Sequence, residues 1–227
     1  MRFIILSFFL FSLSSLSAQK KQNNPDSLAF AFAMKIGDYA SAVDAQYRII
    51  SKDPNNIAKI FTLAELYFDT EQFTLCINTC YWALEKNSKH KKSWQMLAVC
   101  YQREKNSTGA LLAYKELDSL YPDAYNKYQK ATLLFEKKRD QEALNELQKI
   151  INDSTTTKRI ITVTYQTEQK KNEEQSVSMQ AAAYNMAAYI LMNHNENDKA
   201  LFLLQKALEI SPEFQLARGN LNSLKKP

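Results

Sequence analysis

Small and large apolar residues recur along this 227-residue chain with a period of 34. The clearest unit spans residues 91–124, and its signature positions are Trp94, Leu97, Ala98, Tyr101, Ala110, Tyr114, Leu117 and Pro122. Equivalent residues occur in 57–90, in 125–154 and in 181–214, and more weakly in 23–56. Repeats of this length are supersecondary units that bury their apolar faces only by stacking on one another. The period therefore predicts a row of paired helices.

The residue types at these positions resemble the tetratricopeptide repeat (TPR) family, with Ala98 and Tyr114 as conservative replacements for its Gly and Phe. The resemblance covers nearly all of residues 23–226. It implies an all-α fold, a right-handed solenoid of about five helix-turn-helix pairs closed by a capping helix at 215–226. In the fourth unit we expect Tyr128, Ala131 and Phe135 at the first-helix signature positions, and one residue fewer in the turn between its helices.

Residues 1–18 are laid out like a secretory signal peptide. Arg2 precedes an apolar run from Phe3 to Leu13, and a Ser-rich stretch ends at Ala18. The run is shorter than the ~20 apolar residues of a spanning helix. We therefore expect cleavage after Ala18, a solenoid within 19–226 with no transmembrane span in the mature chain, and a periplasmic or secreted location.

An insertion at residues 155–177 interrupts the period. Ile161, Val163 and Tyr165 alternate with more polar neighbours, which is typical of a strand, and the residues after Gln166 are polar and charged. Two interpretations remain open, a surface loop without a task and a short exposed strand that pairs with a partner. We expect the last part of the insertion to extend the first helix of the fifth unit.

Composition excludes several activities. The chain has three glycines, none close to another, so no phosphate-binding loop is present. The net charge is +5, but the basic residues are interspersed with acidic ones and form no concentrated positive stretch, which disfavours nucleic acid binding. His90 and His194 lie far apart and no nucleophile–base arrangement is evident, so we predict that the protein is not an enzyme.

The three cysteines could suggest redox or metal chemistry. Cys76 and Cys80 occupy positions where the family places core residues, so we expect buried, unreactive side chains. A disulfide between Cys80 and Cys100 is the alternative. No histidine has ligand-like spacing to them, so we predict no metal site and no cofactor.

TPR domains generally bind partners on the concave face formed by the first helix of each pair. By offset, the resemblance assigns to this face Phe61, Glu65, Phe68, Gln95, Val99, Gln102, Arg103, Gln129, Leu133, Glu136, Lys137, Asn185, Tyr189 and Met192. For Val99 and Leu133, packing against neighbouring helices is the alternative. Aromatic, amide and charged side chains in this mixture suit an extended peptide.

Together these features predict a non-catalytic scaffold of the cell envelope that binds a protein or peptide in its groove. The alternative is a structural subunit of an outer-membrane-associated assembly, or one that self-associates through the open end of the solenoid. Replacing Phe61 and Phe68 with Ala is expected to weaken partner capture without unfolding the chain.

Overall fold

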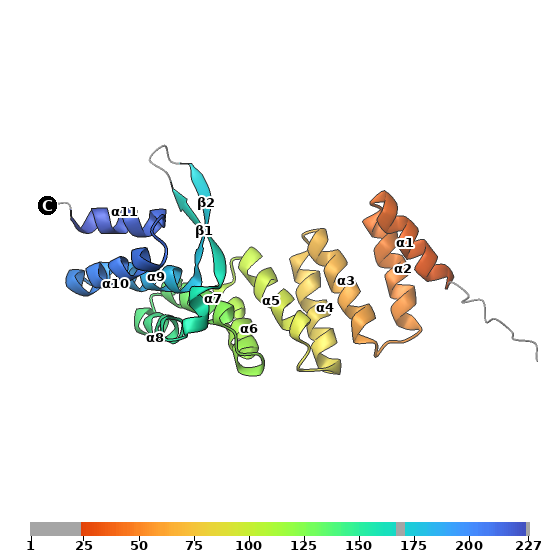
Figure 1. Ribbon diagram of the computed structural model, residues 1–227. Coiled ribbons are helices and arrows are strands. Elements are labelled where there is room, and N and C mark those ends of the chain that lie inside the picture. Colours follow the sequence, from red (N-terminus) through yellow and green to blue (C-terminus); the bar gives the residue numbers. More distant parts are fainter. Residues whose placement is uncertain (1–23, 167–170, 226–227) are drawn as a thin grey trace, which may run out of the picture.

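The structure is a computed structural model, and it describes residues 24–166 and 171–225. The proposed signal peptide, residues 1–18, lies outside the described residues. The first three helix pairs are α1 (Pro25–Ile36) with α2 (Tyr39–Ser51), α3 (Ile57–Asp69) with α4 (Phe73–Lys86), and α5 (Lys91–Arg103) with α6 (Ser107–Leu120). They are followed by α7 (Ala124–Glu136) with α8 (Asp140–Ile151), α9 (Met179–Asn193) with α10 (Asn197–Ile210), and the final helix α11 (Gln215–Leu224). Figure 1 shows the pairs following one another along an elongated body.

Polar side chains define where many of these helices begin. Each of them accepts a hydrogen bond from a backbone N–H in the first turn of the following helix, which satisfies a donor that has no partner within the helix. These capping residues are Asn24, Asp38, Asn56, Asn106 and Asp123.

Each pair is closed by the same tight turn. One residue in every turn adopts a left-handed conformation with φ between 56° and 74°. These residues are Gly37, Glu71, Lys105, Lys138 and Asn195. Just after each of them, a backbone N–H donates back to the last turn of the first helix, as from Gln72 to the Tyr67 carbonyl. The two helices of a pair are thus held antiparallel by backbone geometry.

Small residues lie where helices pack most closely. Ala64, Ala98, Ala110 and Ala200 are completely buried, and Leu63 and Leu97 fill the space around them. The predicted stack of five helix pairs is therefore confirmed.

The register of the fourth pair differs from the prediction. Lys105 follows Glu71 by 34 residues, but Lys138 follows Lys105 by only 33. The carbonyl of Leu134 accepts the bond from Arg139 N–H that the Tyr101 carbonyl accepts from Asn106. Leu134, and not Phe135, is therefore the structural equivalent of Tyr101.

The prediction that the turn of the fourth pair had lost a residue is also wrong. That turn has three residues, 137–139, as do the turns at 70–72 and 104–106. The shortened segment is the connection between α6 and α7, residues 121–123, against four residues, 87–90, between α4 and α5. The missing residue therefore precedes α7.

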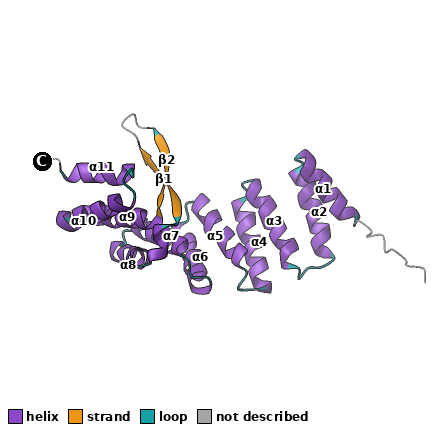
Figure 2. Cartoon of the chain, in the orientation of Figure 1, coloured by secondary structure: helices purple, strands orange, loops and turns teal. Residues whose placement is uncertain are grey.

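The insertion forms a β-hairpin, so the fold is mostly helical rather than all-α. After a short 3₁₀ turn, η1 (Ser154–Thr157), strand β1 (Ile160–Gln166) pairs antiparallel with β2 (Asn172–Ser178). Figure 2 shows the two strands standing out from the helices. Because α9 begins at Met179, the end of the insertion is the second strand and not an extension of the helix. Neither open interpretation included this second strand.

Candidate binding groove

A cleft of about 340 Å³ lies between the first helices of the first three pairs. It is lined by Phe30 and Met34 of α1, by Thr62, Glu65, Leu66 and Asp69 of α3, and by Met96 of α5. No second helix contributes to it, so it belongs to the face that the sequence predicted for binding. We call it the N-terminal groove.

The N-terminal groove combines an apolar floor with an acidic rim. Phe30 and Met96 are half-buried and offer flexible apolar surface. Glu65 and Asp69 are exposed one helical turn apart on α3, so both carboxylates project from the same face. Such a surface fits a segment that carries an apolar side chain beside a basic one. Of the residues that line the N-terminal groove, the alignment of the repeats predicted only Glu65 as a binding residue.

A smaller cleft of about 220 Å³ lies farther along, lined by Gln102, Lys105, Ser107, Leu133 and Glu136. Gln102 bridges the helices around it, because its Nε2 donates to Gln129 Oε1 at 3.2 Å and its Oε1 accepts from the Tyr114 hydroxyl at 3.1 Å. Two of the predicted amide side chains are thus brought together. The Nε2 group of Gln102 and the Oε1 atom of Gln129 are thus engaged with each other.

Three of the predicted groove residues are buried. Phe61 is only 6% exposed, and its ring meets that of His90 edge-on with 5.3 Å between centroids. Leu133 is 3% exposed, in agreement with the packing alternative. Asn185 is 8% exposed, and its Oδ1 accepts a hydrogen bond from Asn220 of α11. Phe61 belongs to the core, so replacing it with Ala is expected to destabilise the fold, contrary to the sequence-based expectation.

The others remain accessible. Gln95, Arg103 and Tyr189 are exposed, and Phe68, Val99 and Met192 are half-buried. Phe68 packs edge-on against Phe73 of α4.

The one-residue shift in the fourth pair changes which of its residues lie on the concave face. Lys137 lies in the turn after α7, and its Nζ donates to Thr108 Oγ1 at 2.8 Å. Phe135, which the sequence placed in the core, is half-buried and meets the Tyr189 ring of α9 edge-on at 5.8 Å. This aromatic contact joins two successive first helices. The left-handed turn positions carry Gly, Glu, Lys, Lys and Asn, so no single residue type in the sequence marks the one-residue shift.

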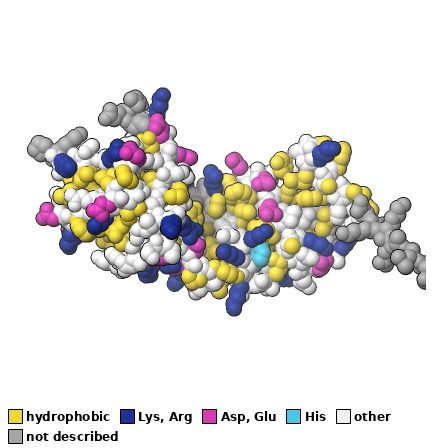
Figure 3. Space-filling model, viewed as in Figure 1, with side chains coloured by type: hydrophobic (Ala, Val, Ile, Leu, Met, Phe, Trp, Pro, Cys, Tyr) yellow, Lys and Arg dark blue, Asp and Glu magenta, His cyan; other side chains and the backbone are white. Residues whose placement is uncertain are grey.

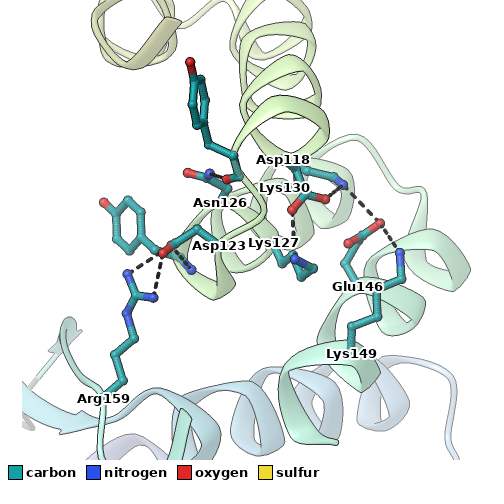
Figure 4. A network of polar contacts seen from close by, with 10 residues as sticks. Asp118, Asp123, Asn126, Lys127, Lys130, Glu146, Lys149 and Arg159 are labelled. Atoms are coloured by element: carbon teal, nitrogen blue, oxygen red, sulfur yellow. Dashed lines mark hydrogen bonds and ion pairs between the residues drawn. The ribbon is translucent and has the colours of Figure 1, made fainter. Parts of the chain in front are cut away.

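A charged network lies between the third and fourth pairs (Figure 4). Lys130 Nζ is 2.9 Å from Asp118 Oδ2 and 3.2 Å from Glu146 Oε1. Lys127 and Lys149 provide a further cation to each carboxylate. The side chains of Asp118, Lys130 and Glu146 are only 12–15% exposed. With the shifted register, Lys130 occupies the position of the buried Leu97, and the two carboxylates compensate its charge.

These contacts set the protonation of Asp118. Burial works against the charged form, but hydrogen bonds from Lys127 and Lys130 outweigh it, so the pKa of Asp118 lies below its ordinary value. The carboxylate is therefore ionised at neutral pH. We interpret the network as the structural consequence of placing a lysine in the core.

The three cysteines are fully buried free thiols. The neighbour of Cys100 is Cys76, at 3.2 Å between sulfur atoms, and not Cys80 as the disulfide alternative required. The hydrogen bond to Cys76, together with burial, raises the pKa of the Cys100 thiol.

Among the described residues, no group of three or more His, Cys, Asp or Glu side chains is arranged to hold a metal ion. The described helices also include none long and apolar enough to cross a membrane.

On the face drawn in Figure 3, basic and acidic side chains are scattered among patches of hydrophobic ones. This mixture differs from the concentrated positive face typical of nucleic acid binding.

Comparison with known proteins agrees with this architecture. TPR family models match residues 93–124 and 181–214. A crystal structure of MamA superposes with a TM-score of 0.61 at 15% identity, over 83% of this chain and 91% of MamA. One of YrrB, described as a TPR protein with an unusual peptide-binding site, has a TM-score of 0.60 at 16% identity, over 84% of this chain and 87% of YrrB.

MamA from Desulfovibrio magneticus RS-1 has a TM-score of 0.59 at 9% identity, over 84% of this chain and 95% of that one. No curated protein sequence matches the chain. Identities this low establish a shared fold and nothing more. Two repeats that match tetratricopeptide repeat models, the five helix pairs and the shared fold identify the chain as a tetratricopeptide repeat protein.

Proposed function

We propose that the protein holds an extended segment of a partner protein in its N-terminal groove, as a scaffold of the cell envelope. The observation that carries this proposal is the cleft lined only by first helices, in which Phe30, Met34 and Met96 line the same space as Glu65 and Asp69. The segment it suits has an apolar side chain next to Lys or Arg. The peptide-binding site attributed to YrrB supports the use of this fold for peptides.

The cell-envelope part of the proposal rests on residues 1–18, whose charged start, apolar run and Ala18 are typical of an export signal. Fractionation of the native host and sequencing of the mature N-terminus test it. Recovery of the protein in the cytoplasm with Met1–Ala18 still attached would contradict it.

Binding is tested with a library of fluorescent ten-residue peptides that vary in apolar and basic content. We expect selection of peptides that place a bulky apolar residue beside Lys or Arg. The variant Glu65→Gln/Asp69→Asn should bind them about fivefold or more weakly, since exposed ion pairs contribute about 1 kcal/mol. Glu85→Gln, on the second helix α4, is the matched control and should bind normally.

Met34→Asp provides an independent variant, because Met34 is exposed on α1 and its replacement leaves the buried core intact. If the selected peptides bound Met34→Asp and the double variant as tightly as they bind the wild type, the N-terminal groove would be rejected as the binding site.

A further inference from the structure

The β-hairpin has two outer edges, and the hydrogen-bond pattern shows which backbone groups face outward. Met179 N–H donates to the Arg159 carbonyl at 2.7 Å, so 159 and 179 form a hydrogen-bonded pair. In an antiparallel ladder such pairs alternate, so residues 161, 163 and 165 of β1 bond within the hairpin. Ile160, Thr162, Thr164 and Gln166 then direct their N–H and C=O groups away from it. Ser178 of β2 confirms this alternation, because its N–H points outward to Ser211 Oγ.

The outer edge of β2 is covered in part, at its Ser178 end. Besides the Ser178 contact, the Gln175 side chain donates to the Glu213 carbonyl at 2.6 Å and accepts from Gln215 N–H at 2.9 Å. These bonds attach β2 to the connection between α10 and α11. The strand also carries Glu173 and Glu174, which discourage further pairing.

The outer edge of β1 lacks every such protection. Its sequence, Ile-Ile-Thr-Val-Thr-Tyr-Gln, contains no charge and no proline, and its pairing with β2 has no bulge. Ile160, Thr162 and Thr164 are exposed, Ile160 by 61%. Within the described chain, no hydrogen bond is recorded for the outward backbone groups of these three residues. Soluble proteins normally protect an edge of this kind, since it is a template for strand addition.

We propose that β1 is the interface through which two copies of this chain dimerise, joining their hairpins into a four-stranded antiparallel sheet. The strand is self-complementary about Val163. An antiparallel register centred there places Thr162 opposite the partner's Thr164 and Ile161 opposite the partner's Tyr165. Thr–Thr and aromatic–β-branched pairs are among the favourable cross-strand contacts.

The surroundings of the hairpin favour a second copy of this chain as the partner of β1. No like charges face each other across the pair, because β1 has no charged residue. The two-fold symmetry makes the contact isologous, so it closes as a dimer and does not propagate. In Figure 1 the upper part of the hairpin extends beyond the neighbouring helix α11. The N-terminal groove of each copy remains free, so dimerisation adds to the proposed function without replacing it.

The experiment measures the mass of the purified protein in solution by light scattering over a range of concentrations. Thr162 and Ser176 face each other in the hairpin, and each directs its N–H outward, one at each edge. Proline at either position removes an outward donor and no hydrogen bond within the hairpin. We expect the wild type and Ser176→Pro to give twice the monomer mass and Thr162→Pro to give the monomer mass.

A pair of charge variants tests the register without altering the backbone. Thr162→Lys/Thr164→Lys sets lysines opposite lysines across the two-fold axis and should be monomeric. Thr162→Glu/Thr164→Lys sets each glutamate opposite a lysine and should remain dimeric. Circular dichroism and thermal midpoints like those of the wild type show that the variants are folded.

A monomeric wild type overturns the proposal, as does a dimer that survives both Thr162→Pro and the double-lysine change. So does the loss of the dimer in Ser176→Pro with the fold intact, since that would place the interface on β2. Dissociation caused by Phe32→Lys, at the exposed end of the solenoid, with the strand variants still dimeric, would assign the interface to α1 instead.

Discussion

Gly109 illustrates how a single residue sets the packing of a helix pair. A Cβ atom built at Gly109 would lie 2.6–2.8 Å from ring atoms of Tyr101, including Cγ, which moves only if Tyr101 changes its χ1 rotamer or the helix shifts. We expect Gly109→Ala to lower the free energy of unfolding by about 1–3 kcal/mol, the usual cost of overpacking. Chemical denaturation measures this.

Gly219 is the matched control. It lies within α11 with nothing within 4 Å of an added Cβ. Gly219→Ala should leave stability unchanged or raise it by up to about 1 kcal/mol, because alanine favours helix and restricts the unfolded chain. Equal effects at the two glycines would disprove the close contact with Tyr101.

Asp118 couples the stability of the protein to pH. The pKa of Asp118 is lower in the folded state than in the unfolded chain. The stabilisation that this carboxylate provides is therefore complete above its unfolded-state pKa of about 3.9, and it is lost as the pH falls through its folded-state pKa. Asp118→Asn should cost about 2 kcal/mol at pH 7, the scale of hydrogen bonds to a charged group. It should also make the acid-side decline of stability shallower.

Urea denaturation at a series of pH values between 7 and 2 tests this. Glu213→Gln removes a mostly exposed carboxylate from its pair with Arg218 and should change stability by less than about 0.5 kcal/mol. An acid-side slope that is the same in Asp118→Asn and the wild type would contradict the role given to the network.

At the scale of elements, the 34-residue period was enough to predict the helix pairs, because each repeat carries its own core positions. It was not enough for the register of α7. Ala131 and Phe135 satisfy the pattern one residue out of place, and a buried Lys130 is not expected at a leucine position. The alternation of apolar residues indicated β1, whereas β2 gives no such signal because most of its side chains are exposed.

The binding residues were only partly predictable for a related reason. An offset identifies which side chains point toward the concave face, but not which of them a neighbouring element covers. Phe61 is covered by His90 from the loop before α5, and Asn185 by Asn220 from α11. Phe30, Met34 and Asp69 line the groove because α1 and α3 border the same cleft, and the spacing within one repeat does not show how far apart successive helices lie.

The attachment of α11 depends on Phe214. This side chain is 1% exposed and lies in the same apolar cluster as Ala217 and Leu204, so it joins α11 to α10. We expect Phe214→Ala to cost about 3–5 kcal/mol and to increase amide exchange throughout α11. Phe202→Ala, at a site on α10 that is 56% exposed, is the control and should have little effect. Unchanged exchange in α11 would show that other contacts hold the helix.

The molecule as a whole contains more than one apolar core. One cluster runs from Ala33 to Leu133, and two others cover the fourth and fifth pairs and α11. At the boundary between the third and fourth pairs, the ion pairs of Asp118, Lys130 and Glu146 take the place of the buried Leu97 at the preceding boundary. Linear repeat arrays unfold as units coupled through their interfaces, so a polar boundary should weaken that coupling.

We therefore expect the two parts to respond separately to destabilisation. Leu63→Ala, in the first cluster, should remove about 2–5 kcal/mol and accelerate amide exchange in α1–α6 while α8–α10 stay protected. Leu204→Ala should produce the reverse pattern. Native-state hydrogen exchange resolved by peptide measures both. If either variant accelerated exchange uniformly along the chain, the boundary would transmit stability fully. The charged network would then couple the two parts of the solenoid as strongly as the apolar contacts it replaces.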